Sequence, residues 1–493
     1  MSDSPRQPAA APGVQRPSTD DVIRWTGIDP AGDGIEVRDP ATDLPIIRVA
    51  DVGADGVDHA VRQARQAAEI WGAMAPRDRA SALLHLAEVI EAHAAELSVL
   101  EALDVGKPIA LVPGEIASAV DKVRFYAGAA RQLSGLAVSE YRPPFTSMLR
   151  RDPVGVVAAL TPWNYPFALA IWKIAPALAA GNAVVVKPSP ETPLTTLMLA
   201  RLADGVLPPG LLAVVTGGAA TGTALVRHSD IDMIALTGGT QTGKAVMAEA
   251  ARRVLPVQLE LGGNAAVLIF EDADLDRLHD AMFMAAFRNS GQDCHAATRV
   301  YTTPTMVDRV AEVITDVARS TVVGDPFDPA TAMGPLVSRA HRDRVAALVS
   351  EASAEPGVRV LTGGQPLAGA GNFYPPTVIT GAPHQSAIVQ QEIFGPVVTI
   401  ATFPDERQAV RLANDVTYGL AASIWTSDMD RVMRITRQLK VGTIWVNSHG
   451  ATVAEMPFGG TKESGFGRDL SLLALEQYTV PKHVAIHVRD LGE

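Results

Sequence analysis

The chain has 493 residues, of which 47% are hydrophobic and 19% charged, and its formal net charge is −12. This length exceeds one compact core, so we expect roughly two to four domain-sized units, and the composition is that of a folded protein. The negative charge and the lack of a basic block argue against a nucleic-acid partner. The single cysteine, Cys294, excludes an internal disulfide and fits a reducing compartment, so we expect a cytoplasmic protein.

Residues 1–20 are rich in proline, alanine and serine and lack the apolar core of a signal peptide, which predicts a disordered tail. No stretch reaches the roughly 18 uncharged apolar residues of a membrane helix. The nearest one, residues 167–186, is interrupted by Lys173, Pro176 and Gly181, so we expect no membrane partner. Apolar residues at helical spacing between about 56 and 104 predict amphipathic helices.

Short β-branched runs alternate with helical stretches twice along the chain. The first series follows residue 153 and the second starts near 264, and this alternation predicts two α/β units with parallel sheets. The closing segment 478–488 alternates apolar and polar residues like a strand with no local partner. We therefore expect it to complete a sheet in another subunit.

Cys294 lies in "NSGQDCHAATR", between a predicted helix that ends near 289–291 and a strand that begins near Arg299. Most free cysteines are buried and inert. This one follows a polar run that we expect to lie near solvent, which favours a reactive thiol.

A nucleophilic thiolate also needs a base and a donor for developing negative charge. Glu260 ends an apolar strand in "QLELGGN", where a carboxylate is either paired with an arginine or functional. Asn164 follows another strand in "LTPWNYPF", where its amide can face an oxyanion, although asparagine also favours turns for backbone reasons.

Further strand ends indicate a ligand crevice. Lys187 ends a buried strand at the usual binding edge of an open α/β sheet. The segment "LTGGTQTG" places Gly238 and Gly239 before a helix, a start that suits phosphate, although it is not the G-x-G-x-x-G fingerprint. Together these positions predict one cofactor crevice.

In order and spacing, "PWNYP", "VVVKPS", "LTGGT", "LELGGN", "GQDC", "QEIFGPV" and "PFGGTKESGFGRD" resemble the aldehyde dehydrogenase superfamily from about residue 35 to 490. The resemblance implies an α/β fold with a Rossmann-type cofactor-binding domain at 21–132 and 153–262. It implies a second α/β catalytic domain at 263–476 and a small β oligomerisation element at 133–152 and 477–493. A homodimer or homotetramer is then expected.

The resemblance also implies residue roles. Cys294 is the nucleophile, Asn164 and the backbone N–H of Cys294 hold the oxyanion, and Glu260 is the general base that hydrolyses a thioester. The cofactor is NAD or NADP, and no metal is expected. The residues placed along the cofactor are Trp163, Lys187, Ser189, Pro190, Gly238, Gly239, Glu392 and Phe394.

Two departures from the family pattern stand out. Pro190 replaces an acidic residue that commonly binds the adenosine ribose, which makes NADP more plausible, and whether Glu191 compensates is left open. The strand end reads "TGGT" where serine often follows the first glycine, which removes one hydroxyl near the pyrophosphate. In addition, the early region shows no obvious strand pair like the family's N-terminal hairpin.

The segments around the site most resemble the aminobutyraldehyde and betaine-aldehyde dehydrogenase branch. Aromatic faces and a carboxylate would favour a cationic ω-amine, so we expect substrate contacts from Tyr165, Trp172, Asp293 and Trp445. His295 is either a polar group of the tunnel or, as we expect, faces backbone or solvent. Phe458 stands where aminobutyraldehyde-type enzymes often have histidine.

The sequence is also compatible with other functions. Dehydrogenases for succinate semialdehyde or for a broad range of aliphatic and aromatic aldehydes are alternatives. Glu260 speaks against a CoA-acylating enzyme, and the joint presence of Cys294, Glu260, Asn164 and Lys187 speaks against a non-catalytic binding or structural homologue.

Overall fold

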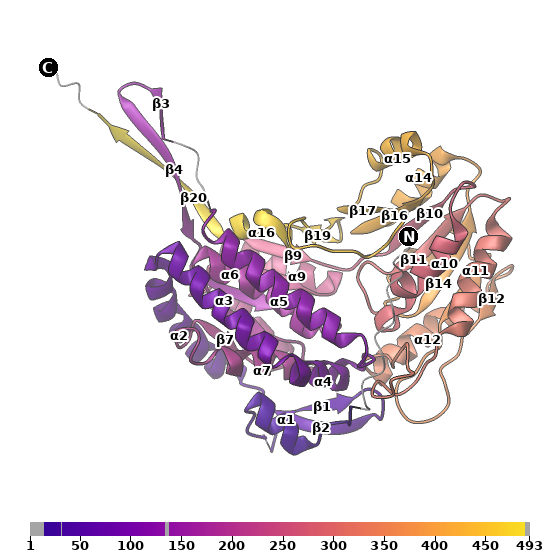
Figure 1. Ribbon diagram of the computed structural model, residues 1–493, viewed down its shortest axis with the longest axis horizontal. Helices are drawn as coiled ribbons and strands as arrows, with labels where there is room; N and C mark the ends of the chain where they lie inside the picture. Colours follow the sequence, from indigo (N-terminus) through magenta and orange to yellow (C-terminus); the bar gives the residue numbers. More distant parts are fainter. Residues whose placement is uncertain (1–13, 31, 134–137, 489–493) are drawn as a thin grey trace.

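The computed structural model describes residues 14–30, 32–133 and 138–488. The first α/β unit is built on a six-stranded sheet in the order β19-β9-β8-β5-β6-β7 (Figure 1). Its strands are β5 (Val156–Leu160), β6 (Ala183–Lys187), β7 (Leu212–Val214), β8 (Met233–Thr237), β9 (Val257–Glu260) and β19 (Gly465–Phe466). All pair in parallel except β19, which is antiparallel to β9. The predicted parallel sheet is thereby confirmed.

Helices cover this sheet on both faces, as its buried apolar strands require. The crossovers are α6 (Pro166–Ala180), α7 (Leu194–Ala203), α8 (Ala219–Arg227) and α9 (Thr240–Ala251). The amphipathic helices expected from the sequence are α2 (Gly53–Ala73), α3 (Pro76–Ala92) and α4 (Ala94–Val105), and a further helix, α5 (Val112–Ala129), follows them. Helix α6 is buried almost throughout because α5 and α3 pack on it from outside.

The N-terminal region corrects two predictions. Helix α1 (Thr19–Thr26) begins with a capping box at Ser18, and Arg16 forms ion pairs with Asp39 and Asp325, so the predicted disordered tail is wrong for residues 14–20. Residues 1–13 lie outside the described ones. A hairpin of β1 (Ile35–Asp39) and β2 (Leu44–Val49) does exist. A register shift after Val37 and a proline in β2 break the alternation that would have revealed it in the sequence.

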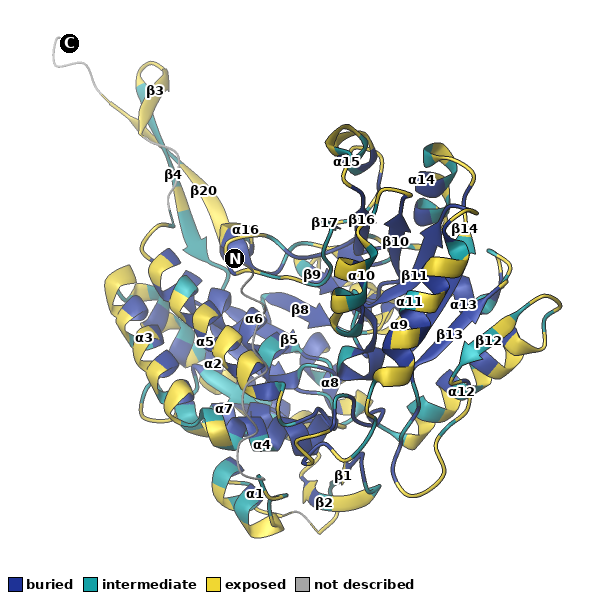
Figure 2. Ribbon diagram, turned by 45° about the vertical axis from the view of Figure 1, so that its right-hand side comes forward, coloured by how far each residue is buried: buried dark blue, intermediate teal, exposed yellow. Residues whose placement is uncertain are grey.

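The second α/β unit has a seven-stranded sheet in the order β12-β13-β14-β11-β10-β16-β17. These strands are β10 (Ala265–Ile269), β11 (Ala297–Thr302), β12 (Arg359–Thr362), β13 (Thr377–Thr380), β14 (Val397–Thr402), β16 (Ala421–Trp425) and β17 (Thr443–Val446). Its helices are α10 (Leu275–Met282), α11 (Val307–Ser320), α12 (Arg339–Ser353), α13 (Ala387–Gln390), α14 (Glu406–Asn414) and α15 (Met429–Thr436). The short pair β15 (Tyr418–Gly419) and β18 (Thr461–Lys462) joins the two units. In Figure 2 the inner strands of both sheets are dark blue, so each unit has its own core.

A three-stranded arm projects from the first unit (Figure 1). It consists of β3 (Ser139–Arg142), β4 (Phe145–Pro153) and β20 (Thr479–His487), in the order β20-β4-β3. The predicted closing strand exists, but it pairs with β4 of its own chain, which corrects the expectation that it has no partner there. Helix α16 (Ser471–Gln477) leads into this arm. Among the described helices, none has the length and apolar character needed to cross a membrane.

Candidate active site

A crevice opens where the strand order of the first sheet reverses. The chain runs outward from β5 through β6 to β7 and then returns to β8 on the other side of β5. Ligands bind at such switch points, beyond the carboxyl ends of the strands. A cavity of about 1020 Å³ lies there. Its lining includes every predicted cofactor residue: Trp163, Lys187, Ser189, Pro190, Gly238, Gly239, Glu392 and Phe394.

The crevice wall has the features of a site for an extended polar ligand. The buried hydroxyls of Thr161 and Thr237 lack a hydrogen-bond partner among the described residues. A Cβ atom added to Gly262 would lie 2.2 Å from a Glu392 oxygen, whereas one added to Gly239 would meet open space. Glycines let the backbone approach a ligand closely. The residues present therefore fit a dinucleotide.

The far end of the crevice is polar. The ammonium of Lys187 donates to the Pro188 carbonyl at 3.0 Å, and burial lowers the pKa of Lys187. Ser189 donates a hydrogen bond to the Glu191 carboxylate, and Glu191 lines the same cavity. The acidic side chain of Glu191 thus lies next to Pro190, the position where the family pattern commonly has an acidic residue.

Sequence reasoning missed two lining residues on α12, His341 and Arg344. The His341 ring lies 5.2 Å from that of Trp163, and its Nε2 donates to the Phe394 carbonyl at 2.7 Å. Burial lowers the pKa of His341 to about 4, so the ring is neutral at pH 7. Arg344 donates to the Glu392 carbonyl at 3.3 Å. The only sequence signal was their spacing of three on an amphipathic helix.

A constrained turn delivers Cys294 to the end of the crevice. Asn289, Ser290 and Gly291 have φ values of 50°, 58° and 67°, three consecutive left-handed residues. The Asn289 amide donates to the carbonyls of Asn164 and Gln292 at 3.0 and 3.2 Å. Residues 289–292 are buried, so the expectation that this run lies near solvent is wrong. Their polar groups are satisfied by backbone carbonyls instead of water.

Strand register brings the cysteine and glutamate segments together. Strands β10 and β11 are adjacent and parallel, with Ala265 opposite Ala297, so the residues before each strand meet at one sheet edge. A Cβ on Gly263 would lie 2.0 Å from the Cys294 carbonyl oxygen. The Gly263 N–H donates to the Glu392 carboxylate at 2.7 Å. Glu392 is thereby fixed between the crevice and the thiol.

Glu260 ends β9 opposite Gly465 of β19 and is 2% exposed. Neither carboxyl oxygen has a hydrogen-bond partner among the described residues, so the alternative of an arginine-paired glutamate is wrong. The nearby ammonium of Lys173 does not pair with Glu260 either, because it donates to Asp469 and Gln258 at 2.7 and 2.8 Å. Burial and the nearby Asp469 charge raise the pKa of Glu260 well above its ordinary value. Such a carboxyl binds a proton more tightly than an ordinary glutamate and is a stronger base when ionised.

Burial also raises the pKa of the Cys294 thiol, and the charges of Asp293, Glu260 and Glu392 act in the same direction. The thiol is therefore protonated at rest and needs a base before it attacks. The Asn164 amide donates one hydrogen bond to the Gln292 carbonyl at 3.1 Å, which fixes it beside the cysteine turn. Its second N–H is left for another acceptor.

Aromatic side chains gather on the other side of Cys294. Tyr165, Trp172 and Trp445 share one apolar cluster with Phe458 and Cys294. The rings of Trp172 and Phe458 lie 5.6 Å apart, and the Trp445 indole N–H donates to the Ala451 carbonyl at 2.8 Å. The structure thus brings three of the predicted substrate residues together.

The fourth, Asp293, is already engaged. The Tyr165 hydroxyl donates to one carboxylate oxygen at 2.9 Å, and His295 Nδ1 lies 2.7 Å from the other. Burial opposes ionisation, but His295, Arg288 and Tyr165 outweigh it and hold the pKa of Asp293 well below its ordinary value. The His295 ring lies 5.5 Å from Trp445 and 5.6 Å from Phe458. The expectation that His295 faces backbone or solvent is therefore wrong.

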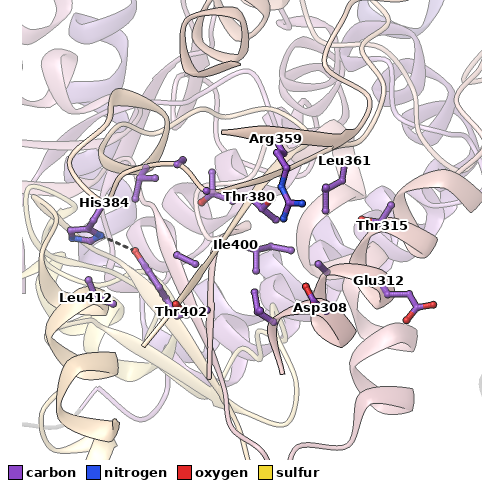
Figure 3. A pocket seen from close by; sticks show the side chains of 18 of the residues that line it. Asp308, Glu312, Thr315, Arg359, Leu361, Thr380, His384, Ile400, Thr402 and Leu412 are labelled. Carbon is purple, nitrogen blue, oxygen red and sulfur yellow. Dashed lines mark hydrogen bonds between the residues drawn. The ribbon is translucent and has the colours of Figure 1, made fainter. Parts of the chain in front are cut away.

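A second cavity, of about 710 Å³, lies between α11 and strands β12, β13 and β14 of the seven-stranded sheet. Figure 3 shows Arg359 extending from its strand over Ile400, with Asp308 and Glu312 on the α11 side. None of the predicted site residues lines it. The candidate active site is therefore the first cavity, where all of the predicted cofactor residues meet Cys294.

Comparisons with known proteins agree with this geometry. The model of the aldehyde dehydrogenase family matches residues 25–484. An NAD⁺ complex of aldehyde dehydrogenase from Bacillus cereus is 36% identical, with 93% of this chain and 94% of that chain covered and a TM-score of 0.90. Betaine aldehyde dehydrogenase from Staphylococcus aureus, in complex with NAD⁺, is 33% identical, with 96% and 97% covered and a TM-score of 0.92. The chain therefore belongs to the aldehyde dehydrogenase family and is an enzyme of that class.

Proposed function

We propose that the protein oxidises an aldehyde to a carboxylic acid with NAD or NADP, and that its substrate carries a cationic amino or ammonium group, as in 4-aminobutyraldehyde. The observation that carries the reaction is that Cys294 and Asn164 line the end of the crevice, and that the charge of the buried, unpartnered Glu260 acts on the Cys294 thiol. A nucleophile, an oxyanion donor and a base are the parts that acyl chemistry at a thiol requires.

Each residue has one task in this reaction. The Cys294 thiol gives its proton to a solvent water molecule and its sulfur attacks the aldehyde carbonyl, while the free N–H of Asn164 and the backbone N–H of Cys294 hold the oxyanion. When bound in the crevice, NAD(P)⁺ would supply the acceptor for the hydride. Glu260 then takes a proton from water, which attacks the thioester and releases the acid. Its raised pKa suits this proton transfer.

The choice of a cationic substrate rests on the aromatic cluster beside Cys294. We take Trp172, Trp445 and Phe458, which share this cluster with Cys294, as the wall of a substrate chamber, because aromatic rings bind cations. The Lys107 ammonium lies 3.9 Å from the centre of the neighbouring Tyr165 ring, so a cation already contacts an aromatic ring next to the cluster. The betaine aldehyde dehydrogenase named above has a similar fold over nearly its whole length.

A second candidate is a neutral aliphatic or aromatic aldehyde. Both oxygens of Asp293 are already engaged by Tyr165 and His295, so the chamber offers no free carboxylate from this residue to a cation. An apolar chamber lined by rings also favours a neutral aromatic substrate.

Two experiments test the proposal. Steady-state rates with 4-aminobutyraldehyde, betaine aldehyde, succinate semialdehyde, hexanal and benzaldehyde, each with NAD and NADP, rank the substrates by kcat/KM. The highest value is expected for a cationic aldehyde, and a clear preference for hexanal or benzaldehyde selects the second candidate. Succinate semialdehyde as the best substrate would contradict both.

The Cys294→Ala variant tests the nucleophile. It removes the only thiol while leaving the crevice intact, so NAD(P)⁺ is expected to bind as before and aldehyde-dependent NAD(P)H formation is expected to vanish. Retained turnover in this variant would sink the assigned chemistry.

We also propose a homodimer or homotetramer held by the arm. Strands β20 and β3 form its two edges, and most of their residues are exposed. Open strand edges pair readily with another chain. Light scattering of the full chain measures the mass, and a monomer at micromolar concentration would contradict the proposal.

A further inference from the structure

Three potential metal ligands converge at the nucleophile itself. The Cys294 sulfur lies 3.8 Å from Oδ1 of Asp293 and 3.8 Å from Nδ1 of His295. The same carboxylate oxygen and ring nitrogen are 2.7 Å apart. One sulfur, one nitrogen and one oxygen therefore form a small triangle on three consecutive residues.

We propose that Asp293, Cys294 and His295 form a binding site for a divalent cation that prefers sulfur and nitrogen ligands, with Zn²⁺ as the best match. Thiolate, imidazole and carboxylate are the ligands that zinc takes in proteins. A sulfur lone pair that binds the ion cannot attack an aldehyde, so the ion blocks the nucleophile reversibly; we call this block the mask. The expected inhibition of aldehyde oxidation rests on the proposed function, whereas the binding of the ion does not.

The triangle is close to the size that zinc requires. Ligand distances of about 2.0–2.3 Å in a tetrahedron place the ligand atoms about 3.4–3.6 Å apart. The two contacts of the sulfur are already near this range, and only the contact between His295 and Asp293 has to open. Water would fill the fourth ligand position of the ion. An ion bound to the three residues keeps the aldehyde from the Cys294 sulfur.

Neighbouring groups hold two of the ligands in place. The Tyr165 hydroxyl donates to the second oxygen of Asp293 at 2.9 Å, which orients the carboxylate and leaves Oδ1 facing the triangle. The His295 ring is packed by Trp445 and Phe458. Support of this kind around metal ligands raises affinity because less ordering is needed on binding.

Binding of the ion displaces protons from two ligands. At 2.7 Å from the carboxylate, Nδ1 of His295 is a hydrogen-bond donor. When the ion binds, Nδ1 gives up this proton, the neutral ring ligates through Nδ1, and the thiol proton leaves to solvent. Affinity for the ion is therefore expected to rise with pH.

Cobalt(II) in place of zinc gives a direct readout. Because Cys294 is the only cysteine in the chain, a thiolate-to-Co²⁺ charge-transfer band in the near ultraviolet reports this site alone. Chelator-treated wild-type protein titrated with Co²⁺ is expected to show the band at one ion per chain, and Zn²⁺ is expected to abolish it. Absence of the band in the wild-type protein would overturn the proposal.

Variants identify the ligands. In Asp293→Asn and His295→Gln, the Zn²⁺ concentration for half-displacement of the band or half-inhibition is expected to rise at least about tenfold. His449→Gln is the matched control, because His449 lies in the same chamber but is bound to Ser423 and to the His295 carbonyl at 3.0 and 2.6 Å. A band lost in His449→Gln but kept in His295→Gln would show that the ligand set is wrong.

Wild-type protein supplies a test that does not depend on the folding of a variant. Zn²⁺ is expected to slow alkylation of Cys294 by iodoacetamide at least about tenfold, with recovery after EDTA. Unchanged alkylation in saturating Zn²⁺ would refute the mask. A cobalt band in a protein that oxidises none of the aldehydes would leave the metal site standing and refute the proposed function.

Discussion

Glu260 ends a strand of the sheet that carries the cofactor crevice, and Asp293 lies beside the proposed substrate chamber. On the first, cofactor side, both carboxyl oxygens of Glu260 lack a hydrogen-bond partner among the described residues, whereas on the second, substrate side, both oxygens of Asp293 are engaged. The two acids are both largely buried, and the charges of both act on one thiol. One has its pKa raised and the other has its pKa lowered. Burial alone therefore does not set the protonation state of an acid, because its partners decide whether the desolvation cost is offset.

The two acids are also expected to contribute differently to activity and to stability. An unpartnered buried group costs free energy in the folded protein and is kept for what it does. A fully hydrogen-bonded network stabilises the local structure, and removing one member leaves another unsatisfied. Variants on the cofactor side should therefore lose activity, and variants on the substrate side should lose stability.

The largest effect is expected for Glu260→Gln. Loss of a general base lowers the steady-state rate on the order of 10²–10⁴-fold. Formation of the thioester does not need this base, so the first turnover should remain and appear as a burst of NAD(P)H in stopped-flow absorbance. The melting temperature should stay equal or rise, since the variant removes an unpartnered acid. A variant that loses the burst along with the steady-state rate would show that Glu260 acts before hydrolysis.

Glu392 offers the next test, through the pH dependence of stability. Burial raises its pKa from 4.5 to about 7, so between these values the folded state keeps a proton that the unfolded state has lost. The free energy of unfolding should therefore fall as pH rises from 4.5 to 7, by about 3 kcal/mol from this group. The Glu392→Gln variant should lack this decline in thermal unfolding scans. Parallel pH curves for variant and wild type would contradict the assignment.

Tyr165→Phe probes the substrate side. The change removes the hydrogen bond to Asp293 and leaves a buried carboxylate oxygen unsatisfied, at a cost of about 1–3 kcal/mol. Urea unfolding should report this loss, while kcat with a small aldehyde should change only a few-fold. A large loss of kcat with unchanged stability would reverse the contrast between the two sides.

The smallest effect concerns the choice of cofactor. Glu191 lines the end of the crevice beside Lys187 and is hydrogen-bonded by Ser189. Its carboxylate repels a 2′-phosphate, so NAD is expected to be the better cofactor. The Glu191→Gln variant should raise the ratio of kcat/KM for NADP over NAD by about threefold to tenfold, consistent with about 1 kcal/mol at a solvent-exposed site. An unchanged ratio would place the 2′-hydroxyl away from Glu191.

The sequence was enough to predict the residues at strand ends, because parallel strands carry them to one edge. Glu260, Lys187 and Gly238 were found in this way: Lys187 and Gly238 line the crevice, and Glu260 ends a strand of the same sheet. The motifs supplied Glu392 and Phe394, which periodicity alone does not single out. The fold class followed from the two alternating series.

Other features depended on contacts between distant segments. His341 reaches the crevice only because α12 packs against the loop of Phe394. The engagement of Asp293 needs Tyr165, which is 128 residues away in the chain. The buried run before Cys294 is hydrogen-bonded to distant backbone, with Asn289 donating to the Asn164 carbonyl and Ser290 to the carbonyls of Gly334 and Pro335. Single-residue patterns contain no information on such pairings.

The pairing of Glu260 with Gly465 links the sheet of the first unit to a late part of the chain. Strand β9 can pair with β8 as soon as both are made, but its outer neighbour β19 follows about 200 residues later, and contacts of such long separation form slowly. Until β19 is in place, the outer edge of β9, including the backbone of Glu260, is open. We therefore expect a nascent chain to bury this carboxyl only when nearly the whole polypeptide has been made.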